Sequence, residues 1–318
     1  MIECQKQCEI AEHTLVQDMD VRWNSTYLML HRLLEQKNAV NLYSIEYGKV
    51  DTLSSNEWDI IKNLTTALKF FYEATLDLSF DDASISIVIP LISLLTRTLQ
   101  VRSENENEIM INMKNSLYDS LNTRFSYIKR QTSLMAATIL NPRFKSKHLN
   151  SDELDLAMSE IISFLTDYNN NSALFRGTDN VSLMSTAPFV LSTSTSNIQQ
   201  DKEGLWDSHD NTPNQMESAG SEDQKTVLKE KSQNNLSEPL RVLQRNADIY
   251  CYWNSSPYLT LRKAVLKYLS ASPTSVPSKQ LFSAAGQIYT DRRNNLLGEK
   301  VEKLLLSVYN IRVFSYEY

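Results

Sequence analysis

Apolar residues recur every three or four positions through residues 54–168, the spacing that places them on one face of successive α-helices. The first stretch opens with Ser54 and Glu57, which have the spacing of a capping box at a helix N-terminus. Alternation of apolar and polar residues, the pattern of a half-buried strand, is missing from these residues. Only 6 Gly and 8 Pro occur among 318 residues, which is few for a turn-rich β protein. The sequence therefore predicts a mostly α fold.

Several residues set the expected limits of these helices. Pro is tolerated mainly in the first helical turn, so Pro90 predicts a helix that begins near Val88. The pair Asn141-Pro142 predicts the end of the short helix that precedes it. Ser151 is the expected cap of the next helix. Another helix is expected to carry one apolar stripe, made of Ile109, Met113, Leu117, Leu121, Phe125 and Ile128.

The chain divides into four expected segments. Residues 1–53 form an N-terminal segment, and residues 54–168 form the helical domain. Residues 169–246 are polar, with few apolar anchors, and cannot bury enough surface to offset the entropy of ordering, so we expect a disordered linker. Residues 247–318 carry three short helical stretches, the first starting at Pro257, the second around Leu281 and the third at Glu299. Three short helices leave apolar surface unpaired, as a dimerisation module requires.

Charge and cysteine content restrict the class of protein. The formal net charge of -6 is mildly acidic, so any contact with nucleic acid must come from local basic patches. Three Cys are an odd and sparse set that fits a reducing compartment. Cys4, Cys8 and His13 share one short segment, a poor basis for a zinc site, so we expect no metal and no other cofactor. No apolar run approaches about 20 residues, so we expect no transmembrane span. Charges interrupt the N-terminus, so we expect no signal peptide.

Four motifs follow one another along the chain: Asp20–Leu30, which contains Arg22 and Trp23; Leu134–Lys145; Asp248–Trp253; and Pro277–Gly286 followed by 291–296. In this order they resemble motifs of the hAT-superfamily transposases and of the BED-type zinc finger proteins descended from them. Val21 stands where the family usually has Thr, and Asn141 where it has Asp. The resemblance implies an insertion-type helical domain over 54–168 and a dimerisation domain over 247–318.

The last motif departs from the family where its chemistry is carried. The family pattern is Ser-Glu-x-x-Phe-Ser, and its Glu resembles the third metal-binding carboxylate of a ribonuclease H-like nuclease; here that residue is Lys279. A two-metal site gathers anionic ligands around divalent cations, and an ammonium group repels them. By the resemblance, the family's two Asp ligands would lie before Met1. We therefore expect an absent or vestigial ribonuclease H-like sheet, no catalytic residue and no enzyme activity.

The resemblance also indicates residues that would contact DNA. In the family the Trp of the Arg-Trp motif stacks on an unpaired base, and the neighbouring guanidinium can hold a phosphate, which here indicates Trp23 and Arg22. The alternative is that Trp23 packs in the helical core while Arg22 pairs with an acid. Arg143 and Lys145 follow a helix end, and they either contact phosphate or belong to a solvated loop.

Six residues of the C-terminal segment are the expected dimerisation contacts: Trp253, Leu281, Phe282, Leu304, Leu305 and Val308. We expect a homodimer, or a heterodimer with related hAT or BED proteins, with DNA as a further partner and neither membrane nor small-molecule substrate. The predicted function is that of a catalytically inactive, transposase-derived nuclear protein that acts through dimerisation and regulates DNA transactions or transcription. Two alternatives stay open: a DNA-binding transcriptional regulator of the BED-finger family, and a truncated hAT transposase subunit.

Overall fold

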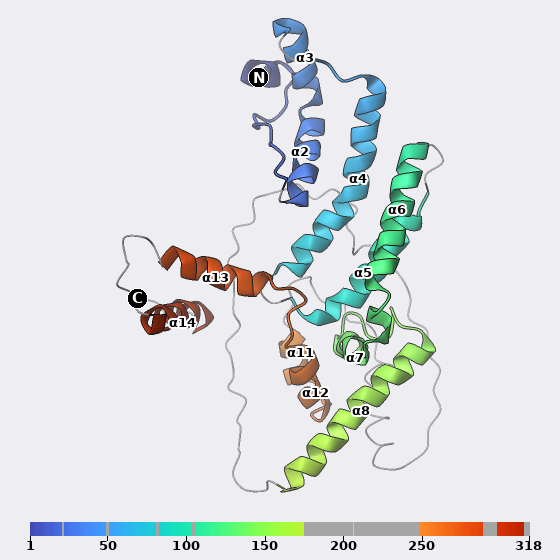
Figure 1. The fold of residues 1–318 in the computed structure, drawn as a ribbon, viewed down its shortest axis with the longest axis vertical. Helices are drawn as coiled ribbons and strands as arrows, with labels where there is room; N and C mark the ends of the chain where they lie inside the picture. The colour runs from blue at the N-terminus through green and yellow to red at the C-terminus, as the bar shows by residue number, and fades with distance from the viewer. Residues whose placement is uncertain are drawn as a thin grey trace. The chain divides into compact units, whose positions relative to one another are not determined.

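The computed structural model describes residues 1–20, 22–48, 51–80, 83–102, 106–174, 206, 249–288 and 298–314. Every regular element in these ranges is a helix, which confirms the mostly α fold (Figure 1). The elements belong to two compact units. No helix within the same ranges is both long and apolar enough to cross a lipid bilayer. The expected linker over 169–246 lies outside the described residues, apart from the end of one helix and Trp206.

The first unit contains α1 (Ile2–Gln7), α2 (Trp23–Glu35), α3 (Lys37–Tyr47), α4 (Ser55–Leu78), α5 (Val88–Gln100), α6 (Glu108–Phe125), the 3-10 helix η2 (Ile128–Arg130) and Trp206. The capping box is confirmed, since the Ser54 amide donates to Glu57 Oε2 at 2.7 Å and the Glu57 amide donates to Ser54 Oγ at 3.3 Å. Helix α5 starts at Val88, as Pro90 predicts. Helix α2 packs on α4, where the rings of Tyr27 and Tyr72 stack with centroids 4.7 Å apart.

The expected apolar stripe of α6 is wrong at its beginning. Asn107 caps the helix by accepting a hydrogen bond from the Ile109 amide. With the first turn set in this way, Ile109 is exposed and the next residue, Met110, is buried. Further along, Leu121 is buried, as the stripe predicts.

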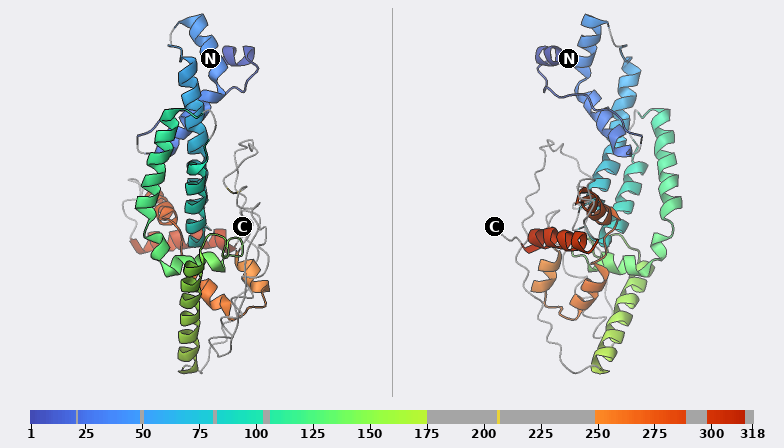
Figure 2. Two further views of the ribbon diagram at one scale, coloured as in Figure 1. Left: turned by 90° about the vertical axis from the view of Figure 1, so that its right-hand side faces the viewer. Right: turned by 60° about the vertical axis from the view of Figure 1, so that its left-hand side comes forward.

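The second unit contains η1 (Ile85–Ile87), α7 (Thr132–Leu140), α8 (Ser151–Leu174), α11 (Ile249–Ser255), α12 (Leu261–Tyr268), α13 (Val276–Ile288) and α14 (Gly298–Phe314). Its core is organised around α7, in which every residue from Met135 to Leu140 is buried. A helix that is apolar on all sides must be covered on all sides. Here η1, α8 and α12 pack against it. Figure 2 shows α12 in orange near α8 in yellow-green.

Helices α8 and α12 meet along an aromatic seam. The rings of Phe164 and Tyr268 lie edge to face with centroids 5.8 Å apart, and Lys267 Nζ lies 4.0 Å from the Phe164 centroid. The Tyr268 hydroxyl donates to Glu160 Oε1 at 3.0 Å. Burial, together with the nearby Glu160 carboxylate, raises the pKa of Tyr268 well above its usual range. The first helices after residue 247 therefore belong to the core of this unit.

Three boundaries differ from the sequence-based expectations. Asn150, and not Ser151, caps α8, because its Oδ1 accepts from the Glu153 amide at 2.8 Å while Glu153 Oε2 accepts from the Asn150 amide at 2.9 Å. Helix α8 continues to Leu174, beyond the expected end at 168. Helix α12 begins at Leu261, four residues after Pro257. Residues 54–168 also contribute to both units, because α7 and α8 bury their apolar faces against helices from beyond residue 247.

Candidate dimerisation and DNA-contact surfaces

Helices α13 and α14 contact each other, and several of their described apolar side chains are exposed. On α13, Phe282 is 76 % exposed and its neighbour Leu281 is also exposed. On α14, Val301 is buried, whereas Leu304 and Val308 are exposed. Leu305 is half-buried. We call Leu281, Phe282, Leu304, Leu305 and Val308 the C-terminal apolar surface. It contains five of the six residues expected to mediate dimerisation.

The sixth expected contact, Trp253, does not belong to this surface. Its side chain is 1 % exposed, and its indole Nε1 donates to the backbone carbonyl of Leu140 at 3.0 Å. The last carbonyls of a helix have no partner within the helix, so this bond satisfies a group at the end of α7. Trp253 is therefore a core residue of the second unit, and its assignment to the interface was wrong because burial by α7 is not visible in the local sequence.

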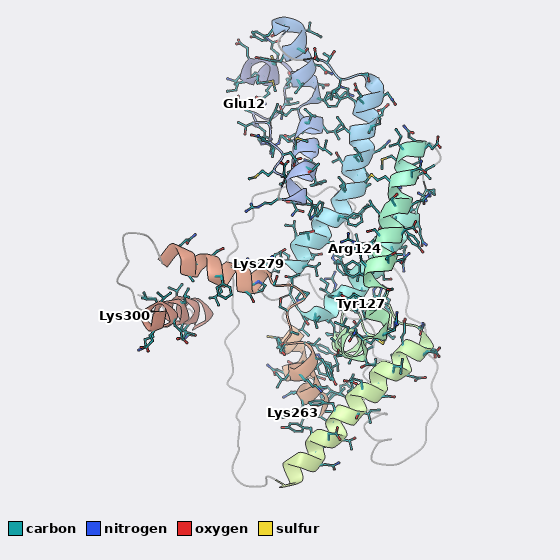
Figure 3. The ribbon with its side chains drawn as sticks, in the orientation of Figure 1. Glu12, Arg124, Tyr127, Lys263, Lys279 and Lys300 are labelled. Carbon is teal, nitrogen blue, oxygen red and sulfur yellow. The ribbon has the colours of Figure 1, made fainter. Side chains whose placement is uncertain are left out.

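Lys279 lies in the first turn of α13, where its amide donates to the carbonyl of Ser275 at 3.0 Å. Its side chain is exposed, and Figure 3 labels it on α13, apart from Lys300 on α14. Among the described residues, no three His, Cys, Asp or Glu side chains come together as a metal site. Cys4 Sγ contacts Glu46 at 3.6 Å, while His13 Nδ1 contacts Glu35 at 2.5 Å, so these two side chains have separate partners. Burial and the Glu46 carboxylate both raise the pKa of the Cys4 thiol.

The Arg-Trp motif lies at the N-terminus of α2, where Arg22 is the cap residue and Trp23 the first helical residue. The Trp23 side chain is 44 % exposed and Arg22 is exposed, so the alternative in which Trp23 packs in the core is wrong. An exposed indole next to a guanidinium and a helix N-terminus can stack on a base and attract a phosphate. The geometry thus leaves both residues available for the DNA contact that the motif indicates.

Asp18 and Ser25 hold the chain around this motif. Asp18 Oδ1 accepts from Ser25 Oγ at 2.6 Å and from Thr26 Oγ1 at 3.0 Å, and Ser25 Oγ accepts from the Met19 amide at 2.8 Å. Both hydroxyls favour the ionised carboxylate, and they lower the pKa of Asp18. The cluster closes the turn that precedes Arg22, and neither the motif nor composition had indicated it.

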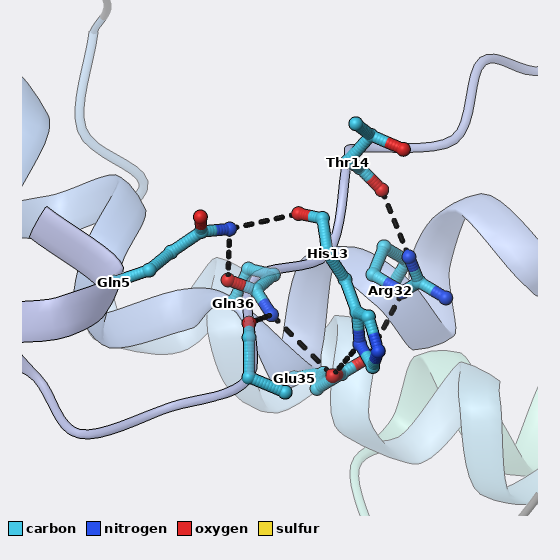
Figure 4. Close-up of polar contacts among 7 residues, drawn as sticks. Gln5, His13, Thr14, Arg32, Glu35 and Gln36 are labelled. Carbon is cyan, nitrogen blue, oxygen red and sulfur yellow. Dashed lines mark hydrogen bonds and ion pairs between the residues drawn. The ribbon is translucent and has the colours of Figure 1, made fainter. Parts of the chain in front are cut away.

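A second polar cluster fastens the segment before the motif to the junction of α2 and α3. Figure 4 shows Gln5 Nε2 donating to the His13 carbonyl at 2.7 Å and to Gln36 Oε1 at 2.8 Å. Arg32 Nη1 donates to the Thr14 carbonyl at 2.9 Å, and Arg32 Nε pairs with Glu35 Oε2 at 2.9 Å. Gln36 is fully buried, so losing one of its hydrogen bonds would cost more folding free energy than losing that of a surface amide. Long-range polar pairs of this kind leave no signature in local sequence.

The other expected DNA contacts, Arg143 and Lys145, do not form a solvated basic loop. Lys145 is fully buried at a positive φ of 46°, and Arg143 is half-buried with its guanidinium 5.8 Å from the Phe144 ring. A phosphate contact requires an accessible cation, so both readings of Lys145, as phosphate contact and as solvated residue, are wrong. The turn that follows α7 folds back onto the second unit, and this buries the Lys145 side chain.

Asn141 explains why an amide suits this turn where the family usually has a carboxylate. Its Nδ2 donates to the hydroxyl of Ser86 at 2.9 Å, and its Oδ1 accepts from the Arg143 amide at 3.0 Å. Asn141 and Ser86 are both buried. A carboxylate could accept the second bond but has no proton to donate to Ser86 Oγ; it could only accept from that hydroxyl, which here donates to Ser84 Oγ. Asn141 is therefore a structural residue that joins η1 to the end of α7.

Comparison with known proteins finds two family models that match the two ends of the chain. Residues 1–67 match the ZBED1 RNase-like helical domain, and residues 222–311 match the hAT family C-terminal dimerisation region. Both matched models describe parts of hAT transposases and of BED-type proteins, so the two ends of the chain are similar to that family. The first match contains Arg22 and Trp23 and continues into α4. The second contains the whole C-terminal apolar surface.

Individual hAT and BED relatives align with nearly all of the chain. Zinc finger BED domain-containing protein 4 of Homo sapiens is 25% identical over 329 residues, covering 100% of this chain and 26% of the relative. Zinc finger BED domain-containing protein 6 of Mus musculus is 24% identical, covering 99% of this chain and 33% of the relative. A Putative AC transposase of Zea mays is 23% identical, covering 96% of this chain and 38% of the relative. The chain thus spans between a quarter and two fifths of the length of these relatives.

Proposed function

We propose that this chain is a catalytically silent, transposase-derived assembly module, in which two copies pair through the C-terminal apolar surface. The observation that supports the proposal is the exposure of Phe282, Leu304 and Val308 within the region that matches the hAT dimerisation model. Burying a Leu, Val or Phe side chain that is now exposed contributes about 1.5–3 kcal/mol. The gain from several such side chains in each copy favours association, because it can exceed the entropy lost when two chains join.

The proposed absence of nuclease activity depends on Lys279. Its exposed ammonium occupies the position of the carboxylate in the family motif, and it cannot serve as a ligand for Mg²⁺ or Mn²⁺. A strand-cleavage assay with Mn²⁺ tests this part of the proposal. We expect no cleavage by the unmodified chain, and Mn²⁺-dependent cleavage by it would refute the assignment.

Equilibrium sedimentation of the full chain tests the assembly. We expect a dimer at tens of micromolar, and a monomer for the double variant Phe282→Asp with Leu304→Asp, because two buried carboxylates without partners oppose association. Ile45→Asp on α3 is the matched control, since Ile45 is 78 % exposed, about as exposed as Phe282, but lies in the first unit. A clean monomer of the unmodified chain, or dissociation caused equally by the control, would contradict the proposal.

The cellular setting of this proposal is the nucleus, where such a dimer would regulate DNA transactions or transcription, either as a homodimer or paired with a related hAT or BED protein. The support is the alignment with zinc finger BED domain-containing proteins. A heterodimer with a longer relative would borrow the DNA affinity of that partner, which suits a chain with a net charge of -6.

A second candidate function is direct contact with unpaired DNA through Arg22 and Trp23. The exposure of the indole favours it, and stacking on an aromatic ring contributes about 1–3 kcal/mol per base. Binding of a fluorescent hairpin with unpaired end bases should weaken roughly tenfold in Trp23→Ala, with a smaller salt dependence in Arg22→Ala. Equal binding by the unmodified chain and both variants would remove this candidate.

A further inference from the structure

The end of α6 and the 3-10 helix η2 form a basic stretch in an acidic chain. Residues 120–131 contain Arg124, Lys129 and Arg130 and no Asp or Glu, whereas the whole chain has a net charge of -6. Both elements belong to the first unit. The Arg124 and Arg130 side chains are exposed, and neither forms an ion pair within the part of the chain that the structure describes. These two cations are therefore accessible to an anionic ligand.

The backbone places Arg124, Tyr127 and Arg130 on one stripe. Beyond the last residue of α6, Ser126 and Tyr127 keep right-handed helical dihedral angles. The Arg130 amide then donates to the Tyr127 carbonyl at 3.0 Å, which closes the turn of η2. Residues three apart are neighbours on an α-helix and eclipse one another in a 3-10 helix. The three side chains consequently follow one another along the same side of this segment.

An exposed aromatic ring lies between the two guanidinium groups of the stripe. Tyr127 is 53 % exposed, whereas Leu121 and Ile128 on the inner side of the segment are buried. Burial of these two apolar residues holds the other side of the segment toward solvent. Figure 3 labels Arg124 and Tyr127 where α6 ends. The stripe thus presents a cation, an aromatic ring and a second cation in succession.

This succession suits a single nucleic-acid strand, in which phosphates alternate with bases. A guanidinium binds phosphate through paired hydrogen bonds, and an aromatic ring stacks on a base whose face is open. In a duplex the bases already stack on each other, so their faces are closed to Tyr127. Helical rise separates the two Arg backbones by about 10 Å along the axis, roughly the length of three stacked nucleotides.

We propose that Arg124, Tyr127 and Arg130 bind single-stranded DNA, with Tyr127 stacked on a base and the two guanidinium groups on phosphates to either side. Stacking and phosphate contacts need no 2′-hydroxyl, so DNA satisfies the stripe as fully as RNA. An acidic peptide would pair with the cations but offers no ring for Tyr127 to stack on. This inference depends neither on the proposed dimer nor on Arg22 and Trp23.

Fluorescence anisotropy of a labelled oligo(dT) strand with the full chain, over a series of salt concentrations, separates the two kinds of contact. Tyr127→Leu should weaken binding about fivefold to a hundredfold at every salt concentration, because one stacked base is lost. The double variant Arg124→Gln with Arg130→Gln should reduce the slope of log affinity against log salt by about 1.4, since each phosphate contact on a single strand contributes about 0.7. No binding by the unmodified chain at low salt, or an unchanged slope in the double variant, would overturn the proposal.

Two matched controls lie elsewhere in the first unit. Tyr47 on α3 is 48 % exposed, but it lies beside the Glu46 carboxylate, which raises the pKa of Tyr47 and repels phosphate. Lys62 is an exposed cation on α4. Tyr47→Leu and Lys62→Gln should both leave the affinity for oligo(dT) within about twofold of the unmodified chain. Effects as large as those of the stripe variants would contradict a localised site. Circular dichroism checks that every variant keeps its helices.

Competition and cross-linking identify the ligand and its place. Duplex DNA and poly-glutamate should each displace the labelled strand at least about tenfold less effectively than unlabelled oligo(dT), because neither offers an open base face. Equal displacement by poly-glutamate, or tighter binding of oligo(U) than of oligo(dT), would contradict the assignment to single-stranded DNA. Ultraviolet cross-linking of a strand that carries 5-iodouracil should modify Tyr127. Cross-links confined to Trp23 would remove this site while supporting the separate contact through the Arg-Trp motif.

Discussion

Trp253→Phe should destabilise the second unit without weakening the proposed dimer. The indole N–H of Trp253 satisfies the Leu140 carbonyl at the end of α7, and the ring is 1 % exposed. Phe removes the donor and leaves a buried carbonyl without this partner, which costs about 1–3 kcal/mol. The smaller ring also leaves a void of roughly 40 Å³, which costs about 1 kcal/mol. We therefore expect the free energy of unfolding to fall by about 2–4 kcal/mol.

Urea denaturation followed by circular dichroism measures this change, at one protein concentration because dimerisation contributes to apparent stability. Trp23→Phe is the matched control, since the Trp23 ring is exposed and its loss should change stability by no more than about 0.5 kcal/mol. The dimer dissociation constant of Trp253→Phe, measured under native conditions, should equal that of the unmodified chain. An unchanged unfolding free energy with a weakened dimer would refute the reasoning and return Trp253 to the interface.

Two further predictions concern polar residues. Asn141→Asp removes the proton that bonds Ser86 Oγ and should lower the free energy of unfolding by about 1–3 kcal/mol in the same urea assay, whereas an unchanged midpoint would show that the bond is dispensable. Asp18 has a lowered pKa, so its stabilising effect is present above the ordinary value of about 3.9 and is lost as the pH falls through the lowered value. The stability difference between the unmodified chain and Asp18→Asn should therefore be constant from about pH 7 to pH 5 and shrink in more acidic solution; a difference that persists at the lowest pH would contradict this origin.

Features set by neighbouring residues could be predicted from the sequence. The capping box at Ser54 and the start of α5 before Pro90 depend on contacts within one helical turn, and the structure confirms both. The cap of α8 was misplaced by one residue, because Asn150 and Ser151 are both good caps and only the hydrogen bonds to Glu153 distinguish them.

Features that depend on burial by distant segments could not be predicted. Trp253 and Phe282 are both aromatic residues of the same C-terminal segment, yet the first is covered by α7 and the second is exposed. Lys145 was expected at the surface because of its charge, but the turn after α7 buries it. Trp206 lies in the stretch expected to be a linker, yet it is buried and its indole donates to Asp77 on α4. In each case the deciding partner lies far away in the sequence.

Isotope-filtered NMR of a mixed dimer tests the central claim most directly. Chains with ¹³C-labelled Leu and Val methyl groups are mixed with unlabelled chains, so that only contacts between copies give cross-peaks. We expect such cross-peaks from Leu281, Leu304 and Val308, and none from the buried methyl groups of Leu261 and Val265 on α12. Contacts between copies that involve other surfaces while α13 and α14 give none would contradict the account.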